Sequence, residues 1–359
     1  MKILVLANNS GGLYRFRKEL MQKMIEEGHK VYASTPFDDF IEELREIGVC
    51  LIETPINRRG MNPIKDFGLL MTYYRMIKKL KPDLIVTYTI KPNLYGCTIA
   101  RLLNKQYTIN ITGLGTAFQN DGLLKKMVVR WYKFVCKKVK VVFFENEGNK
   151  KVFTSNKIID EEKCVCLNGA GVNLEDFPYK SYPHDEDTIH FLFIGRIMKE
   201  KGIEELFYAI SKLKDENYPV VLDILGGYED NYKEMIDEYV KKGIVNYFGY
   251  QNDVRPFIEQ CHCFVLPSYH EGMANTLLES AAMGRPLITS NIHGCLEAVD
   301  NNGYLCKVKD SKDLYKNMKK FIELSHDKKV QMGLNSRKHV ENVFDKKKVV
   351  NKTMEGMGL

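Results

Sequence analysis

Short runs of β-branched residues alternate with helical segments along nearly the whole chain. The first such unit is KILVLA, a Gly-containing loop, the helical stretch YRFRKELMQKMIEEG that ends at Gly28, and then HKVYAS. This is the pattern of a β-α-β unit, whose two strands lie parallel in one sheet. Further strands are expected at 49–53, 83–88, 107–111 and 141–144, with helices between them. The first half therefore predicts a doubly wound parallel sheet.

A polar, proline-bearing stretch, FPYKSYPHDEDT at 177–188, interrupts this rhythm. The alternation then starts again, with strands expected at 190–194, 220–225, 245–248, 263–266 and 286–290. We therefore predict an α/β protein of two Rossmann-like, doubly wound domains, residues 1–176 and residues 177–343, which face each other across a ligand-binding cleft. The last segment, 344–359, is expected to be a helix that crosses back onto the first domain.

The positive charge is confined to the first half of the chain. Residues 1–180 carry 29 Lys+Arg against 19 Asp+Glu, a balance of +10, and residues 181–359 carry 24 against 27, a balance of −3. The stretch LLKKMVVRWYKFVCKKVK at 123–140 combines cations with an apolar stripe at helical spacing. It is either an ordinary amphipathic helix on the sheet or a helix that leans on an anionic membrane.

No apolar run approaches the roughly 18 to 20 residues that span a bilayer. The apolar part of the N-terminal MKILVLANNSGG is also too short for a signal peptide. These features favour a cytoplasmic protein.

The Gly-rich loops after the expected strands differ in what they predict. Neither NNSGGLYRF nor TGLGTAF has the GxGxxG spacing, which disfavours dinucleotide binding. In FIGRIMKEKGIEEL, Gly195 ends a strand, and Arg196 and Lys201 precede a helix. Two cations at the start of a helix suit a diphosphate, because its charge is matched by both the side chains and the helix N-terminus.

The stretch HEGMANTLLESAAMGRPLI places two acids around the expected start of a helix near Asn275, a residue of the capping type. Glu271 then lies in the loop before the helix, and Glu279 lies about one turn inside it. Both carboxylates can face one pocket, where they would accept hydrogen bonds from a polyhydroxylated ligand. The backbone N–H groups at Met273 to Thr276 are expected to face the phosphate of that ligand.

Four stretches of the second half together resemble the C-terminal domain of the retaining glycosyltransferases of family 4, which have the GT-B fold. They are GRIMKEKGI, FGYQNDV, LPSYHEGMANTLLESAAMGRPLITS and GCLEAVDNNGYL. In the first half, TYTIKPNLYG and NITGLGTAF resemble the branch of that family that builds capsular polysaccharide and O-antigen repeat units on undecaprenyl diphosphate.

The resemblance implies a metal-independent, cofactor-free enzyme that retains the anomeric configuration of the sugar. It would move galactose or an N-acetylhexosamine from a UDP-sugar, bound by the second domain, to an undecaprenyl-diphosphate-linked acceptor, bound by the first. Such an enzyme is expected at the inner face of the plasma membrane, on the anionic lipid surface that the basic first half suits.

The resemblance also implies roles for the charged residues. Glu271 is expected to hold the donor sugar, Glu279 the ribose, and Arg196 and Lys201 the diphosphate as it leaves. The other residues expected to bind the donor lie in the loops around these four: Gly195, Gly249, Tyr250, Gly272, Met273, Ala274, Asn275 and Thr276.

Many members of the family have a histidine in the first domain that touches the donor sugar, but NITGLGT has none. Asn110, Thr112 and the backbone of Gly113 are expected to take its place. The loop at Gly11 and Gly12 is expected to border the cleft, where its backbone could approach the diphosphate or the acceptor closely. A simple strand-to-helix turn is the alternative there.

The acids of HDED at 184–187 are similar to a metal-binding DxD motif, but their place in the linker favours a solvated segment.

Two other functions remain open from the sequence. One is a retaining transferase with a soluble acceptor, which would work without lipid or detergent. The other is a catalytically inactive partner subunit that binds nucleotide sugars, although the intact set of Glu271, Glu279, Arg196 and Lys201 argues against it. Nucleic acid is not expected as a partner, because the second domain would then have no role.

Overall fold

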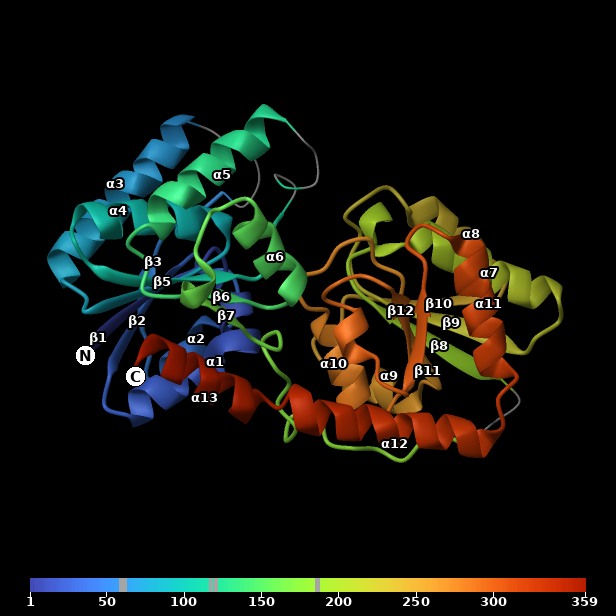
Figure 1. The fold of residues 1–359 in the computed structure, drawn as a ribbon. Coiled ribbons are helices and arrows are strands. Elements are labelled where there is room, and N and C mark those ends of the chain that lie inside the picture. Colours follow the sequence, from blue (N-terminus) through green and yellow to red (C-terminus); the bar gives the residue numbers. More distant parts are fainter. Residues whose placement is uncertain (58–62, 116–117, 119–121, 185–187) are drawn as a thin grey trace. The chain divides into compact units, whose positions relative to one another are not determined.

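The computed structural model describes residues 1–57, 63–115, 118, 122–184 and 188–359. They divide into two compact units, Met1–Ala170 with Lys346–Leu359 and Gly171–Asp345 (Figure 1). The division falls between residues 170 and 171, whereas the sequence analysis placed it between 176 and 177. The reason is that the Val172 N–H donates to the Phe344 carbonyl at 2.8 Å, which ties the segment after Ala170 to the second unit.

The described part of the first unit is built on a seven-stranded parallel sheet in the order β3-β2-β1-β4-β5-β6-β7. Its strands are β1 (Lys2–Leu6), β2 (Lys30–Thr35), β3 (Cys50–Glu53), β4 (Leu84–Tyr88), β5 (Gln106–Ile111), β6 (Val142–Phe144) and β7 (Cys164–Cys166). Its helices are α1 (Ser10–Glu26), α2 (Ile41–Glu46), α3 (Pro63–Leu80), a π-helical turn (Pro92–Gly96) that continues into α4 (Cys97–Leu102), α5 (Leu123–Cys136), α6 (Glu147–Ser155) and α13 (Lys346–Met357).

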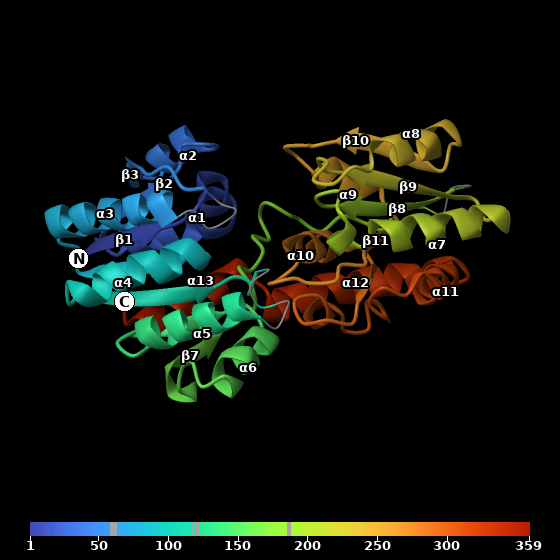
Figure 2. The same cartoon turned by 90° about the horizontal axis from the view of Figure 1, so that it is seen from above.

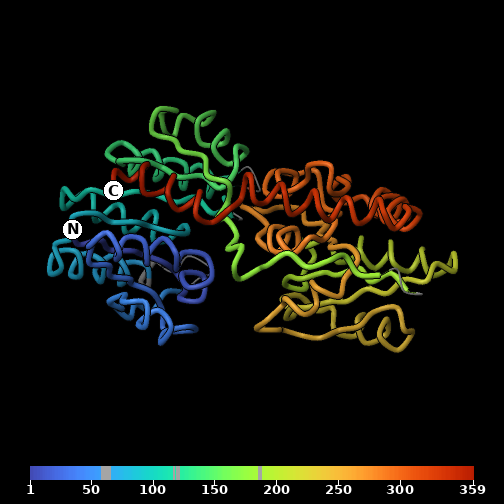
Figure 3. Tube along the Cα trace, turned by 90° about the horizontal axis from the view of Figure 1, so that it is seen from below, coloured from blue at the N-terminus to red at the C-terminus, as the bar shows by residue number. Residues whose placement is uncertain are grey.

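Two apolar cores hold these helices against the two faces of the first sheet. Side chains of α3, α4, α5 and α6 pack on one face, and side chains of α1, α2 and α13 pack on the other (Figure 2). The C-terminal segment thus completes the first unit, where α13 lies beside α1 (Figure 3). The strands are buried on both faces, which explains why they appear in the sequence as continuous apolar runs.

The second unit is built, in its described residues, on a six-stranded parallel sheet in the order β10-β9-β8-β11-β12-β13. Its strands are β8 (Ile189–Ile194), β9 (Val220–Leu225), β10 (Val245–Gly249), β11 (Cys263–Leu266), β12 (Leu287–Ser290) and β13 (Gly303–Cys306). Its helices are α7 (Ile203–Asp215), α8 (Lys233–Lys241), α9 (Arg255–Gln260), α10 (Asn275–Ala282), α11 (Ser311–Ile322) and α12 (His326–Val343).

The strand order reverses once in each sheet, between β1 and β4 in the first and between β8 and β11 in the second. At such a reversal the loops leave neighbouring strands in opposite directions, and the crevice between them is the usual ligand site of a doubly wound sheet. Each unit therefore has one place where a site is expected. Within the described residues, no helix has both the length and the apolar character that crossing a bilayer requires.

Candidate active site

The reversal in the second sheet brings together two of the residues that the sequence analysis singled out. Lys201 follows β8 and Glu271 follows β11, and their side chains form an ion pair between Nζ and Oε1. The two side chains are only 17% and 12% exposed. An ammonium and a carboxylate thus lie side by side at the place where the fold favours a ligand.

The turn that carries Lys201 is fixed to the loop after β11. Gly202 has φ +71°, and a Cβ at this position would overlap the carbonyl oxygen of Pro267, so the two segments touch through their backbones. The Tyr269 hydroxyl donates to both carboxylate oxygens of Glu205, at 2.8 and 2.9 Å. Burial and then this bond raise the pKa of Tyr269, which keeps its hydroxyl protonated as a donor. The turn of Lys201 is therefore held against the loop that leads to Glu271 by a backbone contact and by the bonds of Tyr269.

Gly294, which the sequence analysis did not identify as a site residue, holds the loop of Glu271 from the other side. A Cβ on Gly294 would lie 2.6 Å from the carbonyl oxygen of Gly272 and 2.9 Å from that of Glu271, and its φ is +90°. The Ala274 N–H donates to the Gly294 carbonyl at 2.8 Å. This bond uses the Ala274 N–H, so the expectation that it faces a phosphate is corrected.

The helix after this loop begins at Asn275, as predicted, but Asn275 is not its capping residue. The capping position is Ala274, and the Asn275 side-chain oxygen is buried without a hydrogen-bond partner among the described residues. Glu279 lies one turn further along, on the same face of α10. Thr276 is half-buried beside Asn275, and the N–H groups of both have no acceptor inside the helix. This end of α10 is therefore suited to a ligand that donates to Asn275 and accepts from the backbone.

The other residues that were predicted to bind the donor are less closely associated with the ion pair. The Arg196 side chain is 57% exposed, and its Nη1 lies 3.5 Å from the Glu229 carboxylate, so it is loosely held. Gly249 ends β10 with φ +67°, and Tyr250 after it is 59% exposed. Because β9 separates β10 from β8, these two residues lie further along the edge of the sheet than Lys201.

Gly195 and Met273 take part in the internal packing of the second unit. A Cβ on Gly226 would overlap the Gly195 carbonyl oxygen, so position 226 requires glycine, and Gly195 takes part in this close contact through its backbone. Met273 is 6% exposed, and its side chain belongs to the apolar core of the second unit. Only its backbone is left to face a ligand.

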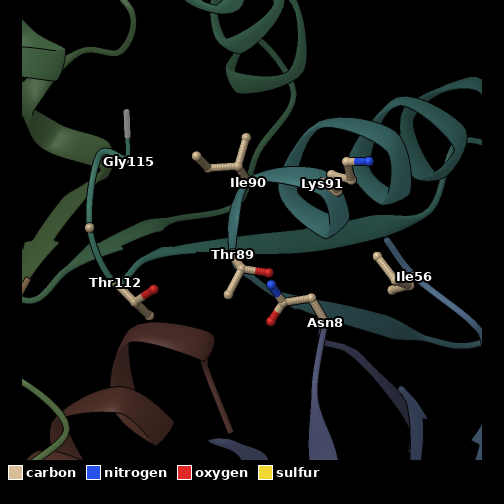
Figure 4. A pocket seen from close by; sticks show the side chains of 8 residues that line it. Asn8, Ile56, Thr89, Ile90, Lys91, Thr112 and Gly115 are labelled. Atoms are coloured by element: carbon tan, nitrogen blue, oxygen red, sulfur yellow. The ribbon is translucent and has the colours of Figure 1, made fainter. Parts of the chain in front are cut away.

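The reversal in the first sheet forms a pocket of about 250 Å³ (Figure 4). Its walls come from the segments that follow β1, β3, β4 and β5 at their carboxyl ends. The lining residues are Asn8, Ile56, Thr89, Ile90, Lys91, Thr112, Gly113 and Gly115. Thr112 and Gly113 were predicted from the sequence, and the other six were not.

Thr89 has an unusual backbone in this pocket. Its φ is +71°, a region that β-branched residues rarely adopt. Its hydroxyl is buried with no hydrogen-bond partner in the described part of the chain, and Figure 4 shows its side chain pointing toward that of Asn8. Lys91 forms an ion pair of 2.8 Å with Asp66. The π-helical turn that follows is a local irregularity of the kind often found at functional sites.

Three predicted residues of the first half lie outside the lining of this pocket. Asn110 lies in β5 and is 4% exposed, and its side-chain amide donates to the Thr87 carbonyl of β4 at 3.2 Å, within the sheet. Gly11 and Gly12 lie in the first turn of α1, and the Gly12 N–H donates to the Asn9 side chain. Asn9 caps α1 by accepting this N–H with its side-chain oxygen, so the Gly12 amide is already used within the strand-to-helix turn.

Of the HDED segment, residues 185–187 lie outside the described residues.

Comparison with known proteins gives matches along both units. Residues 2–146 match the family model described as glycosyl transferase 4-like, and residues 177–339 match that of the glycosyl transferases group 1. The chain is 28% identical to the N,N'-diacetylbacillosaminyl-diphospho-undecaprenol alpha-1,3-N-acetylgalactosaminyltransferase of Campylobacter jejuni, over 93% of this chain and 92% of that protein. It is 27% identical to the UDP-Gal:alpha-D-GlcNAc-diphosphoundecaprenol alpha-1,3-galactosyltransferase of Escherichia coli, over 89% and 85%. The crystal structure of Anabaena HepE in complex with UDP and glucose matches with a TM-score of 0.82 at 15% identity, over 100% of this chain and 99% of that one.

Proposed function

The chain belongs to the GT-B glycosyltransferases that join a glycosyl transferase 4-like domain to a group 1 domain, and we propose that it builds a lipid-linked saccharide. In this proposal it moves galactose or an N-acetylhexosamine from a UDP-sugar to an undecaprenyl-diphosphate-linked acceptor during capsule or O-antigen synthesis. The names of the two relatives support an undecaprenyl-diphosphate-linked acceptor, since each name includes a diphospho-undecaprenol substrate. The UDP in one relative's name and in the HepE crystals supports the donor.

The observation that carries the proposal is the pair of Lys201 and Glu271 at the reversal of the second sheet. When the bond from the sugar to UDP breaks, the β-phosphate gains negative charge. An ammonium held beside that oxygen stabilises the charge at little cost of reorganisation, which is usually the largest catalytic contribution. Glu271 then accepts hydrogen bonds from hydroxyls of the sugar, and the exposed Arg196 completes the positive surface around the diphosphate.

The inferred reaction takes place on one face of the sugar ring. The bond between the anomeric carbon and the UDP oxygen breaks, and that β-phosphate oxygen takes the proton of the incoming acceptor hydroxyl. The acceptor oxygen forms its bond to the anomeric carbon on the same face, so the configuration is retained and UDP leaves with the proton. The reaction needs neither a nucleophile from the protein nor a metal ion, unlike glycosidases, in which two carboxylates flank the bond.

The pocket of the first unit is proposed to bind the acceptor. Hydroxyl and amide groups of Asn8, Thr89 and Thr112 suit a saccharide, and the Lys91 ammonium suits an acidic group such as the diphosphate. The basic first half is proposed to hold the enzyme on the anionic inner face of the plasma membrane.

The test is transfer from UDP-galactose, UDP-N-acetylgalactosamine, UDP-N-acetylglucosamine and UDP-glucose to polyprenyl-diphosphate-linked saccharides, with and without EDTA. We expect transfer from one of the first three, unaffected by EDTA, and a product that NMR shows to keep the α-configuration of the donor. Transfer only to soluble sugars would favour the soluble-acceptor alternative. Tight binding of a UDP-sugar without turnover on any acceptor would favour the inactive partner subunit.

A further inference from the structure

The stretch TYTIKPNLYG runs from the end of β4 through the π-helical turn and contains one asparagine, Asn93, which is 1% exposed. Both ends of its side-chain amide are hydrogen-bonded. The Thr87 hydroxyl donates to Asn93 Oδ1 at 2.7 Å, and the Asn93 Nδ2–H donates to the Asn110 carbonyl at 2.9 Å. Thr87 belongs to β4 and Asn110 to β5, so Asn93 links the carboxyl ends of two neighbouring strands.

The backbone of Asn93 binds Thr89, a residue of the pocket wall. The Asn93 N–H donates to the Thr89 carbonyl at 2.9 Å. Thr89 has φ +71°, a strained conformation that persists only where the surrounding structure enforces it and that is typical of functional sites. Because the side chain of Asn93 is tied to two strands, this bond fixes the Thr89 carbonyl relative to the sheet.

The two strand residues that Asn93 binds each lie two positions before a residue of the pocket. Thr87 precedes Thr89, and Asn110 precedes Thr112. The Asn110 side-chain amide also donates to the Thr87 carbonyl at 3.2 Å, which closes the network within the sheet. Figure 4 shows Thr89 and Thr112 on the two segments that leave these strands. The network therefore lies at the base of the pocket.

Lys91 brings a cation to the same wall, two residues before Asn93. Its ammonium donates to Asp66 of α3 at 2.8 Å, and the two side chains are 14% and 12% exposed. Burial and then the charge and hydrogen bond of Asp66 raise the pKa of Tyr95 to about 12, which keeps its hydroxyl protonated as a donor. The turn between Lys91 and Tyr95 is thus bonded to α3 as well as to the sheet.

We propose that Asn93 is a positioning residue of the pocket. It holds Thr89 in its strained conformation, so that the Thr89 hydroxyl, buried without a partner among the described residues, stays directed toward Asn8 and is available to a hydroxyl group of the acceptor saccharide. The identity of this ligand rests on the proposed function. The hold on Thr89 does not, because it follows from the hydrogen bonds of Asn93.

Kinetics with a polyprenyl-diphosphate-linked N-acetylhexosamine as acceptor test the inference. Asn93→Ala should raise the KM for this acceptor by about tenfold, because the Thr87 hydroxyl and the Asn110 carbonyl lose their partner and Thr89 can relax to a negative φ. The fall in kcat should be smaller than the rise in KM, since the change weakens binding of the acceptor. The Kd for UDP, whose proposed site lies in the second unit, should stay within about twofold.

A second change, Thr89→Gly, separates positioning from general stability. Glycine adopts a positive φ without strain, so the backbone at position 89 then no longer depends on Asn93. In this background, Asn93→Ala should change the acceptor KM by less than about twofold relative to Thr89→Gly alone. A residue that acted only on the stability of the first unit would raise the KM equally in both backgrounds.

The matched control is Tyr107→Phe, which removes a buried hydrogen bond from the same strand, β5. The Tyr107 hydroxyl donates to the Val135 carbonyl at 2.5 Å, and Tyr107 lies toward the amino end of the strand, away from the pocket. This change should leave the acceptor KM unaltered. Far-UV circular dichroism and UDP binding show whether each variant is folded. If Asn93→Ala does not fold, Thr87→Val removes only the bond to Asn93 Oδ1 and should raise the KM by about threefold.

Hydrogen exchange followed by mass spectrometry gives a readout that needs no substrate. Peptides that cover residues 88–96 should exchange at least about tenfold faster in Asn93→Ala than in the wild type, because the turn loses its attachment to the sheet. In Tyr107→Phe these peptides should exchange at the wild-type rate.

Three results would overturn the inference: an unchanged acceptor KM in folded Asn93→Ala, an equal rise in KM with and without Thr89→Gly, or unchanged exchange of residues 88–96. A wild type that uses no lipid-linked acceptor would instead reject the proposed function. Exchange then decides the inference alone, since faster exchange confined to Asn93→Ala supports the hold on Thr89 and unchanged exchange rejects it.

Discussion

Replacing Lys201 by Met removes the ammonium that pairs with Glu271 and keeps a side chain of similar length. The two side chains are 17% and 12% exposed, so little water can replace the lost partner. Removing one partner of a fully buried pair costs about 3–5 kcal/mol. An exposed pair is worth about 0–1 kcal/mol. Because this pair is mostly but not fully buried, we expect Lys201→Met to lower the free energy of unfolding by about 2–3 kcal/mol.

A double-mutant cycle with Glu271→Gln isolates the interaction between the two charges. The double variant leaves neither charge unpaired, so its loss of stability should be smaller than the sum of the single losses by about 1–3 kcal/mol. Urea unfolding followed by circular dichroism measures all three variants. Lys199→Met is the matched control in the same turn, since Lys199 is 63% exposed and 3.7 Å from Glu204. Additive losses from the two single changes would refute coupling between Lys201 and Glu271.

The same variants test the role of the ammonium in turnover. If Lys201 stabilises the leaving diphosphate, its loss should lower kcat by about 10²–10³-fold, as the loss of one preorganised donor does in other active sites. The Kd for UDP should change less, because the charge on the diphosphate grows as the bond breaks. A kcat of Lys201→Met equal to that of Lys199→Met would show that the ammonium does not act on the leaving group.

Three further outcomes test other parts of the site. Glu279→Ala should weaken UDP binding and reduce the rise in melting temperature that UDP causes in the wild type; an unchanged rise would move the nucleotide away from α10. Gly294→Ala should lower kcat by displacing the loop of Glu271. The control is Gly243→Ala, because Gly243 also has a positive φ but nothing lies within 4 Å of a Cβ there. This change should lower the free energy of unfolding by about 1–2 kcal/mol and leave kcat unchanged. Equal kcat values for the two glycine variants would refute the packing argument. Product formed with inverted anomeric configuration would exclude the reaction on one face of the ring.

Most of the fold could be predicted from the sequence, because strands buried on both faces appear as apolar runs between helical segments. The run expected at 83–88 is β4 (Leu84–Tyr88), and the one at 220–225 is β9 (Val220–Leu225). The sequence analysis missed β7 (Cys164–Cys166) and β13 (Gly303–Cys306). Both are short edge strands without an alternating burial pattern, so pairing with a neighbour decides their structure more than the local pattern does.

The charged part of the candidate site was also accessible from the sequence, because Lys201 and Glu271 follow apolar runs that end at one edge of a parallel sheet. The residues that hold this pair in place could not be identified from the sequence. Gly294 acts through a backbone contact with a segment some twenty residues earlier in the sequence, and only the folded chain shows that contact. The positive φ of Thr89 is likewise invisible, since a threonine after a strand normally predicts extended backbone.

The two strand reversals share a feature that bears on function. Each has a buried polar atom without a hydrogen-bond partner in the described part of the chain: the Asn275 side-chain oxygen at the second sheet and the Thr89 hydroxyl at the first. A buried group left unpaired costs about 1–3 kcal/mol, and a ligand that supplies the partner recovers this cost. In the proposed function, a hydroxyl of the donor would pair with the Asn275 oxygen in the second unit, and a hydroxyl of the acceptor would pair with that of Thr89 in the first.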